Sequence, residues 1–350
     1  MSTSLRKLAN ILKRVGQPAK VAASADGTRL LVLPYGGRVL GLYTAKSELN
    51  FYWTNPALAT MESSRKFFAA DGWPNSGGDR TWLGPEVDFF LPDFPKTDCY
   101  VQQRALDPGH YQVVETGGGL QLVNRLTVHA SRFKAGLNLR ITKSFAPAPN
   151  PLRHERGLDL RGVAYAGYTQ FTSLELLGRS RMTQARVGLW NLVQMPHGGE
   201  MAIPTYSRAE PFPVFGTISP ADLIVQERAV RYRMRQAGAQ KISLRAVAMC
   251  GRVGYTCRTD GQWSLIVRNF RVNPSGEYVD GPWTDPNRLG FAVQACNVNN
   301  ELGAFSELEY HIPAIGHGTG GTRCDDAAQV WAFRGTERQM ANARKLLLGV

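Results

Sequence analysis

The sequence predicts an all-β protein whose strands are mainly antiparallel, with a short helix at each end. Many short segments alternate apolar and polar residues with period two, which is typical of half-buried strands. Turn residues separate these segments throughout, and the chain of 350 residues contains 36 Gly and 20 Pro. Strands do not alternate with long helical segments, so the pattern favours an antiparallel sandwich or barrel over a parallel α/β sheet.

The first helix is predicted at residues 4–15, and the second at 336–348. In the first, Ser4 is a candidate N-cap and Gly16 a candidate stop. Apolar residues between them fall at helical spacing: Leu5, Leu8, Ile11, Leu12 and Val15. The segment lacks the apolar run and cleavage site of a signal peptide, so we expect a cytoplasmic protein. We therefore expect an N-terminal helix (1–16), a β-sandwich domain (17–334) and a C-terminal helix (335–350).

The strands are predicted in order between these helices, with a strand content above about 35%. They are expected at 29–34, 37–43, 111–115, 120–127, 137–145, 168–177, 187–194, 229–234, 241–248, 263–272, 290–297 and 306–312. The longest irregular stretch, 51–98, is rich in Trp, Pro, Gly and Asp. A stretch of this length in a compact protein usually forms functional loops.

Composition and short motifs exclude several classes of protein. No apolar run approaches the roughly 18 residues that a membrane-spanning helix needs. Five scattered cysteines without a CxxC pair predict neither a disulfide framework nor a zinc site. No phosphate-binding loop, dinucleotide fingerprint, nucleophile elbow or HExxH motif is present, so we expect no cofactor and no metal.

The net charge of +13 favours an anionic partner. The alternative is that the base composition of the source genome gives many arginine codons and so produces the charge. On a strand, Arg231, Arg233 and Arg235 would share one face, where guanidiniums repel each other unless anions intervene. If that face lies near the substrate pocket, the substrate is an anionic sugar. Otherwise these arginines pair with acidic residues or face water.

One polar and aromatic cluster lies at residues 77–86, where Asp79, Arg80, Trp82 and Glu86 follow two glycines. Sugar sites use this mixture, because a Trp ring packs on the C–H face of a pyranose while Arg and carboxylates bind hydroxyls. The alternative is an ion pair of Arg80 with Glu86 or Asp79 that holds a long loop in place.

A second cluster lies on the predicted strand 306–312. Period-two geometry places Glu307, Glu309 and His311 on one face of this strand. Neighbouring carboxylates and an imidazole shift each other's pKa values, as acid–base catalysis requires. His197, in a Gly-rich turn after another predicted strand, is a further candidate acid or base. The alternative is a solvated strand face with cross-strand ion pairs.

Three motifs resemble an uncharacterised bacterial family of domain-of-unknown-function type. They are Gly-Gly-Arg-Val at 36–39, Phe-Tyr-Trp-Thr-Asn-Pro at 51–56 and Gly-Gly-Asp-Arg-Thr-Trp-Leu-Gly-Pro-Glu at 77–86. That family resembles the galactose mutarotase-like (aldose 1-epimerase) superfamily, whose fold is a β-supersandwich. The resemblance runs from about residue 5 to 334. The chain departs from it by one missing acidic residue before Asp79 and by the absence of the superfamily's Asn-His motif.

The resemblance implies a sugar-binding protein that opens and recloses a sugar ring by acid–base catalysis. For this chemistry we expect Glu309 to be the base, with Glu307 as the alternative, and His197 or His311 to be the acid. The candidate binding residues are Arg80, Trp82 and Glu86, together with Asp79, Trp53 and Arg38. A glycoside hydrolase or lyase, a non-catalytic glycan-binding or structural protein and, less favoured, a nucleic-acid binder remain alternatives.

Overall fold

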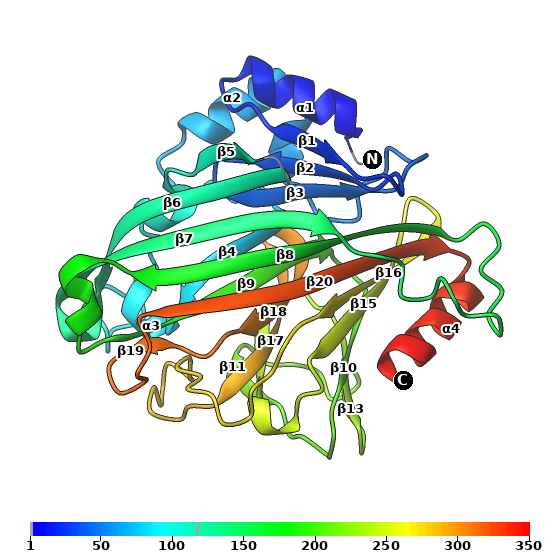
Figure 1. The fold of residues 1–350 in the computed structure, drawn as a ribbon. Coiled ribbons are helices and arrows are strands. Elements are labelled where there is room, and N and C mark those ends of the chain that lie inside the picture. The colour runs from blue at the N-terminus through cyan, green and yellow to red at the C-terminus, as the bar shows by residue number, and fades with distance from the viewer. Residues whose placement is uncertain (1–2, 117–118) are drawn as a thin grey trace.

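Two ten-stranded antiparallel sheets pack face to face in the computed structural model, which describes residues 3–116 and 119–350 (Figure 1). Strands account for 44% and helices for 16% of the chain. This confirms the predicted fold class, all-β and mainly antiparallel with a short helix at each end.

The first sheet carries the candidate site. Its strand order is β1-β2-β3-β4-β9-β18-β17-β14-β11, with β19 paired to β9. The strands are β1 (Lys20–Ala23), β2 (Arg29–Leu33), β3 (Arg38–Tyr43), β4 (Asp79–Gly84), β9 (Arg186–Pro196), β11 (Phe212–Phe215), β14 (Gly238–Arg245), β17 (Phe291–Asn300), β18 (Gly303–His311) and β19 (Ile315–Gly316).

The second sheet covers the inner face of the first. Its order is β12-β13-β10-β15-β16-β20-β8-β7-β6-β5. The strands are β5 (Gln112–Thr116), β6 (Gly119–Ala130), β7 (Ala135–Pro147), β8 (Ala164–Leu176), β10 (Glu200–Pro204), β12 (Leu223–Val225), β13 (Ala229–Arg233), β15 (Arg252–Thr259), β16 (Gln262–Asn269) and β20 (Arg323–Gly335).

The main hydrophobic core fills the space between the sheets, and alternation along each strand decides which side chains enter it. On β18, Leu308 and Tyr310 point inward, and the Tyr310 hydroxyl donates to Asp326 of the second sheet (2.6 Å). Because neighbouring residues of a strand point to opposite faces, Glu307 and Glu309 point to the outer side of the first sheet. The same alternation on β4 buries Asp79 between the sheets and sends Arg80 outward.

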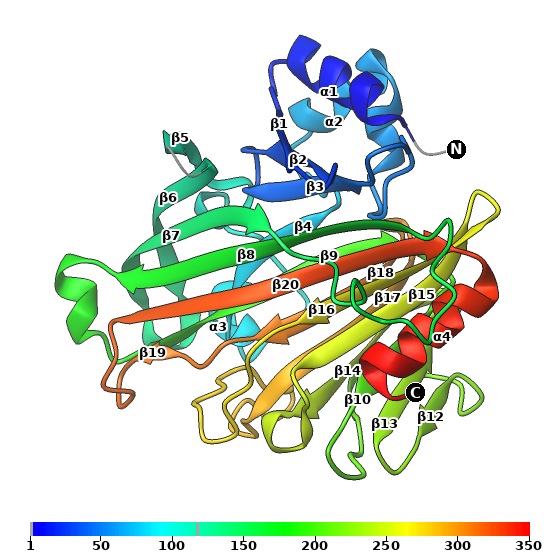
Figure 2. The ribbon, with the colours of Figure 1, turned by 45° about the vertical axis from the view of Figure 1, so that its right-hand side comes forward.

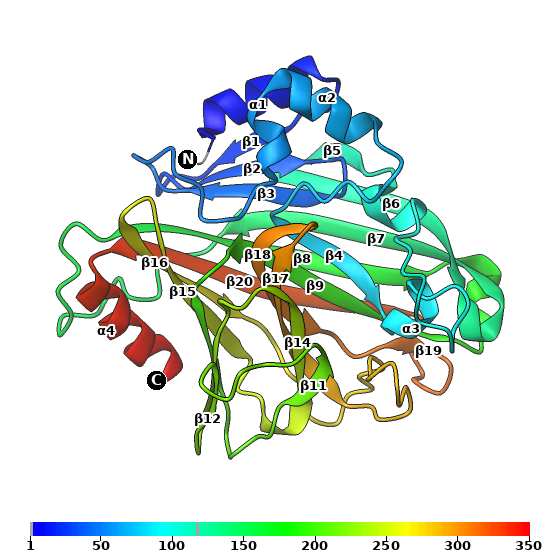
Figure 3. The same ribbon diagram turned by 180° about the vertical axis from the view of Figure 1, so that it is seen from behind.

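The terminal helices lie where the sequence predicts them. α1 (Leu5–Arg14) is capped by the Ser4 hydroxyl, and Gly16 follows with a φ of +79° that favours glycine. α4 (Glu337–Leu348) starts with a capping box in which Thr336 and Gln339 bond reciprocally. α1 packs on the outer side of β2 and β3, and α4 packs on the outer side of the second sheet (Figures 2 and 3).

The predicted irregular stretch 51–98 is more ordered than expected. It contains α2 (Met61–Ala69), β4 and the one-turn helix α3 (Glu86–Phe89). Every residue of β4 is buried, so the strand lacks the polar–apolar alternation that marks a half-exposed strand. α2 follows its N-cap Thr60 and was missed because it is only nine residues long and weakly amphipathic.

Several strands and turns also differ from the prediction. The strands β1, β10, β11, β12, β15, β19 and β20 were not predicted. The predicted strand 241–248 ends earlier, because β14 stops at Arg245 and a 3₁₀ turn, η5 (Ala246–Ala248), follows. The other short turns are η1 (Pro56–Ala59), η2 (Ala105–Gly109), η3 (Ser131–Phe133) and η4 (Gly178–Met182). Within the described ranges, every helix is too short or too polar to traverse a bilayer.

Candidate functional site

A pocket of about 650 Å³ opens on the outer face of the first sheet. Strands β4, β9, β14, β17 and β18 form its floor, and the segments around α3 and Trp283 form part of its wall. Its lining includes five of the residues that the sequence singled out: Arg80, Trp82, Glu86, Glu307 and Glu309. The two predicted clusters, more than 200 residues apart in the chain, therefore meet in one pocket.

Strand register brings these side chains together. Glu309 on β18 lies opposite Leu192 of β9 and Gln294 of β17, while Glu307 lies opposite Gln194 and Cys296. In the next strand along, Arg80 of β4 lies opposite Leu192. Directly opposed residues of antiparallel strands point to the same face, so register brings Arg80, Glu307 and Glu309 together.

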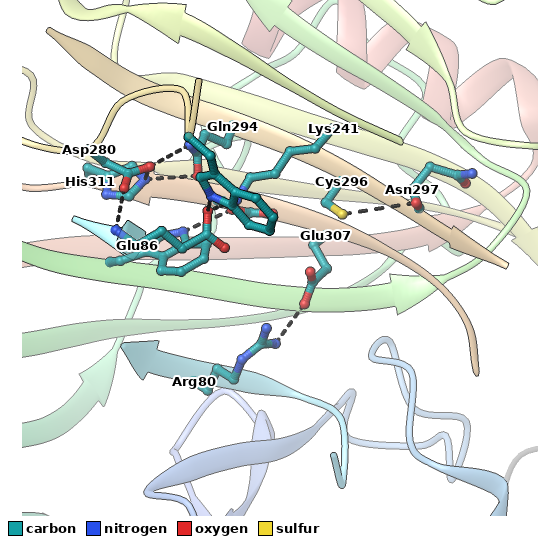
Figure 4. Close-up of polar contacts among 12 residues, drawn as sticks. Arg80, Glu86, Lys241, Asp280, Gln294, Cys296, Asn297, Glu307 and His311 are labelled. Carbon is teal, nitrogen blue, oxygen red and sulfur yellow. Dashed lines mark hydrogen bonds and ion pairs between the residues drawn. The ribbon is translucent and has the colours of Figure 1, made fainter. Parts of the chain in front are cut away.

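Glu307 is held by an arginine and an amide. The Arg80 Nη1 atom lies 2.7 Å from Glu307 Oε1, and Gln194 Nε2 donates to the same oxygen at 3.0 Å. The Arg80 side chain is only 2% exposed, and its guanidinium lies 4.1 Å from the centre of the Trp82 ring. Figure 4 shows the Arg80–Glu307 pair. A buried cation with a carboxylate on one side and an aromatic face on the other is fixed in position.

Lys241 of β14 joins two further carboxylates. Its Nζ atom lies 3.4 Å from Glu86 Oε2 and 3.5 Å from Glu309 Oε2, and 4.3 Å from the Trp190 ring centre. Burial alone would lower the pKa of Lys241, but Glu309 and Glu86 outweigh it and raise the pKa above its ordinary value. Lys241 is therefore a permanent cation in the pocket.

Glu309 is the carboxyl whose protonation the site perturbs most clearly. Burial raises its pKa to about 8, and repulsion from Glu307 and Glu86 adds to the effect of burial, while Lys241 opposes it. Trp190 Nε1 donates to Glu309 Oε2 at 2.9 Å. The other oxygen, Oε1, accepts no hydrogen bond from the described part of the chain. Glu309 thus holds a proton through much of the neutral range and keeps one oxygen free.

Glu86 sits on the opposite wall of the pocket. Tyr100 donates its hydroxyl to Glu86 Oε1 (2.7 Å), and Trp283 donates its indole N–H to Glu86 Oε2 (3.1 Å). The Tyr100 ring stacks on both Phe90 and Trp283, with centroid distances of 5.2 and 5.8 Å. The walls therefore combine hydrogen-bonding groups with flat aromatic faces.

His311 shares the outer face of β18 but does not line the pocket. Its ring stacks on Trp190 and its Nε2 lies 2.9 Å from Gln294 Oε1 and 3.7 Å from Asp280 (Figure 4). Burial lowers the pKa of His311 to about 3, with a smaller contribution from Lys241. The neutral imidazole stacks on Trp190, which lines the pocket, and is not itself among the lining residues.

His197 follows the end of β9 and lies outside the pocket lining as well. It is half-buried, and its Nε2 atom has no hydrogen-bond partner among the described residues. Neither of the two predicted histidine acids is therefore among the residues that line the pocket.

The remaining three predicted binding residues lie behind the pocket. Asp79 is buried between the sheets, where Arg268 Nη2 approaches its Oδ2 to 3.1 Å. Arg38 donates to Asp107 (2.6 Å), and Trp53 packs on Phe305 with ring centres 4.8 Å apart. None of the three is among the residues lining the pocket.

Asp107 connects Arg38 to the pocket indirectly. Its Oδ2 also accepts the indole N–H groups of Trp73 and Trp82, each at 2.9 Å, and both of these rings line the pocket. Arg38 and Asp107 therefore fix the orientation of two aromatic walls.

Several residues that line the pocket were not predicted as site residues: Lys241, Trp190, Trp283, Tyr100 and Cys296. Gln194, which holds Glu307, was not predicted either. Nothing in the sequence around Lys241 distinguishes it from a surface lysine. Strand register places Lys241, Trp190 and Cys296, while Tyr100 and Trp283 lie in loops that fold over the sheet. Both kinds of placement are long-range contacts, which a single sequence does not reveal.

One group in the pocket has the spacing of metal ligands. A ligand atom from each of Cys296, Glu307 and Glu309 lies within 4.8 Å of the others. The cations Arg80 and Lys241 already pair with the two carboxylates. Burial raises the pKa of the Cys296 thiol well above its usual range, and Glu307 and Glu309 raise it further. A metal ion would have to displace both ion pairs and a thiol proton, so the donor set fits a metal poorly.

No protein-family model matches the chain, and no curated protein is significantly similar to it in sequence. Among solved structures, a galactose mutarotase-like protein from Lactobacillus casei superposes with a TM-score of 0.52 at 8% identity, over 90% of this chain and 99% of that one. A galactose mutarotase related enzyme from Lactobacillus acidophilus gives 0.49 at 11% identity, over 91% and 98%. A putative aldose 1-epimerase from Escherichia coli K12 gives 0.46 at 12% identity, over 91% and 99%. With its two antiparallel sheets, the chain has the fold of the galactose mutarotase-like proteins.

Proposed function

We propose that this protein binds a sugar in the pocket of the first sheet and catalyses acid–base chemistry at its anomeric centre. The observation that carries the proposal is that Arg80, Trp82, Glu86, Glu307 and Glu309 line one pocket. A purely structural set of polar loops would scatter these groups over separate surfaces. The fold that the chain shares with the galactose mutarotase-like protein from Lactobacillus casei also supports sugar binding.

The residues that line the pocket are suited to bind the hydroxyl groups and the C–H faces of a sugar. Trp73, Trp82 and Trp283 offer faces for pyranose C–H groups, while carboxylates and cations offer acceptors and donors. Each cation already pairs with a carboxylate of the pocket. Arg231 and Arg233, which would have indicated an anionic sugar if they lay near the pocket, are on β13 of the second sheet, and Arg235 follows the end of that strand. The preferred substrate in our proposal is therefore a neutral aldose.

The chemistry we propose is ring opening and closure, as in an aldose 1-epimerase. Glu309, with a pKa of about 8, gives its proton to the ring oxygen while Glu307 takes the proton of the anomeric hydroxyl. The C1–O5 bond breaks, the C1–C2 bond rotates, and the reverse proton transfers close the ring on the other face. Glu309 thus acts as the acid on ring opening, which reverses the role expected from the sequence. Two carboxyls in different environments can divide the work in this way.

Glycoside hydrolysis fits the geometry less well. The paired carboxyls of a hydrolase flank the scissile bond from opposite sides. They lie about 5–5.5 Å apart in retaining enzymes and about 6.5–9.5 Å apart in inverting enzymes. Here Glu307 and Glu309 project from the same face of one strand, with oxygens within 4.8 Å of each other. The other alternative is a non-catalytic glycan-binding protein, in which the same ion-paired network only recognises the sugar.

Anomer exchange measured by NMR on a panel of neutral aldoses tests the proposal. We expect faster exchange with the protein present, and the Glu309→Gln variant should lose on the order of 10²-fold in turnover. Glu115→Gln, on the exposed Lys20 ion pair, is the control and should be unchanged. Sugar binding without any acceleration would establish the non-catalytic alternative. Absence of binding by every sugar would show that the pocket serves another class of ligand.

A further inference from the structure

A second hollow, of about 420 Å³, lies on the outer face of the second sheet beside α4. Its lining includes five arginines, which come from β13, the segment after it, β15 and α4: Arg231, Arg233, Arg235, Arg258 and Arg344. None of these residues lines the sugar pocket. The arginine-rich segment noted in the sequence is therefore part of a different concave surface.

Register explains why the arginines meet. Glu200 of β10 lies opposite Arg233 of β13 on one side and Thr256 of β15 on the other. Tyr255 points inward and donates its hydroxyl to Pro196 O (2.6 Å), so Thr256 and Arg258 point outward. The aromatic side chain opposite Arg258 on β16 is Trp263, which also lines the hollow.

The C-terminal helix closes one side of this hollow. α4 contacts β10, β15 and β16, and Figure 2 shows it beside these strands. Glu337, Ala341 and Arg344 lie three or four residues apart, so they form one stripe of the helix that faces the hollow. Arg344 reaches across to Glu200, with a distance of 2.8 Å between Nη1 and Oε1.

The charges in the hollow are not balanced. Glu200 accepts both Nε and Nη2 of Arg231 at 2.9 Å, together with Arg344, and Arg233 lies 3.4 Å away. One carboxylate thus serves three guanidiniums. Burial would raise the pKa of Glu200, but Arg231 and Arg344 outweigh it and lower the pKa. Arg233 is 41% exposed, so its guanidinium remains accessible to a ligand.

We propose that this hollow binds the phosphate group of a small phosphate ester. Guanidiniums form bidentate, charge-assisted bonds to phosphate oxygens. Five guanidiniums line the hollow together with the carboxylates of Glu200 and Glu337. Arg235 also pairs with Asp222 (2.7 Å). The positive charge of these groups still exceeds the negative charge by two. The volume exceeds what a bare phosphate fills, and Trp263 and Thr256 offer a flat face and a hydroxyl to the rest of the ligand. The proposal does not depend on the sugar pocket, because the two sites lie on different sheets.

Calorimetric titration of the full chain at low and at high salt tests this site. The probes are inorganic phosphate, a hexose phosphate and a nucleoside monophosphate, with the unphosphorylated hexose as a blank. We expect the phosphates to bind and the affinity to fall with added salt, because exposed charges are screened within about 10 Å at 0.1 M. Tighter binding of one ester than of inorganic phosphate identifies the organic part that Trp263 contacts. Absence of binding by all three phosphates overturns the proposal.

Two variants make the test specific. Arg233→Gln combined with Arg258→Gln should weaken phosphate binding about tenfold or more, since it removes two charged donors. Arg323→Gln, which removes an exposed guanidinium paired with Asp325, is the matched control and should bind as the wild type does. Equal weakening in both would show only a general charge effect and contradict the site.

Glu200→Gln provides a gain-of-function test that misfolding cannot imitate. In the proposed site Glu200 competes with the ligand for Arg231, Arg233 and Arg344, so its neutralisation should tighten phosphate binding several-fold. Unchanged or weaker binding, in a variant whose circular dichroism and thermal unfolding match the folded protein, would overturn the proposal.

Discussion

The protonation of Glu309 links chemistry and stability at the scale of a single residue. Its pKa rises from the usual 4.5 to about 8 because burial penalises the charged form. Lys241 offsets part of that penalty, while Glu86 and Glu307 add to it. In the proposed mechanism this carboxyl is therefore protonated and able to act as an acid near neutral pH, and its ionisation destabilises the fold.

Activity should fall as the pH rises through about 8, because Glu309 then loses the proton that the ring oxygen needs. Measuring the anomer-exchange rate at a series of pH values tests this decrease. The residual rate of Glu309→Gln should show no such decrease near pH 8. A wild-type rate that is flat between pH 7 and 9 would remove Glu309 as the acid.

Stability should follow the same titration, with the sign set by linkage. The folded-state pKa lies above the unfolded one, so the stabilisation is fully present below 4.5 and is lost as the pH rises through about 8. The Gln side chain of Glu309→Gln cannot ionise. The thermal unfolding midpoint of this variant, relative to that of the wild type, should therefore rise as the pH increases from 5 to 9. Thermal unfolding of both proteins across this range measures the difference. A constant gap between the two proteins would contradict the raised pKa.

The elements show where sequence patterns suffice and where they fail. β18 was predicted because polar and apolar residues alternate along it, and the face assignment of Glu307 and Glu309 follows from that alternation. β4 was missed because both of its faces are buried, even though its residues Arg80 and Trp82 had been singled out by composition. The pairing of these two elements through β9 is a long-range contact that local patterns do not encode.

The C-terminal helix offers an element-scale prediction. Thr336→Ala removes the side chain that accepts from the Gln339 N–H, and should cost about 1 kcal/mol in the free energy of unfolding. Thr336→Ser keeps the acceptor oxygen and should restore most of the loss. Chemical denaturation of the three proteins measures it. An equal loss in both variants would show that methyl packing, not capping, is what Thr336 contributes.

At the scale of the whole molecule, each sheet uses its outer face differently. The outer side of the first sheet carries the ion-paired pocket, and the outer side of the second carries α4 and the arginine hollow. Buried polar groups cross the interface between the sheets. Asp79, which the sequence analysis placed with the sugar-binding residues, pairs there with Arg268 and accepts the Tyr168 hydroxyl at 2.7 Å. Composition marked Asp79 as important, but only the alternation of β4 shows which way it points.

Asp79 should therefore be a residue of stability and not of ligand binding. Both it and Arg268 have fully buried side chains, so Asp79→Ala leaves an uncompensated guanidinium between the sheets and should cost about 3–5 kcal/mol. The double variant Asp79→Leu with Arg268→Met removes both charges and should recover much of that loss. Chemical denaturation measures the stabilities, and sugar affinity measured on the folded fraction should match that of the wild type. A weaker affinity at unchanged stability would return Asp79 to the pocket and contradict its place between the sheets.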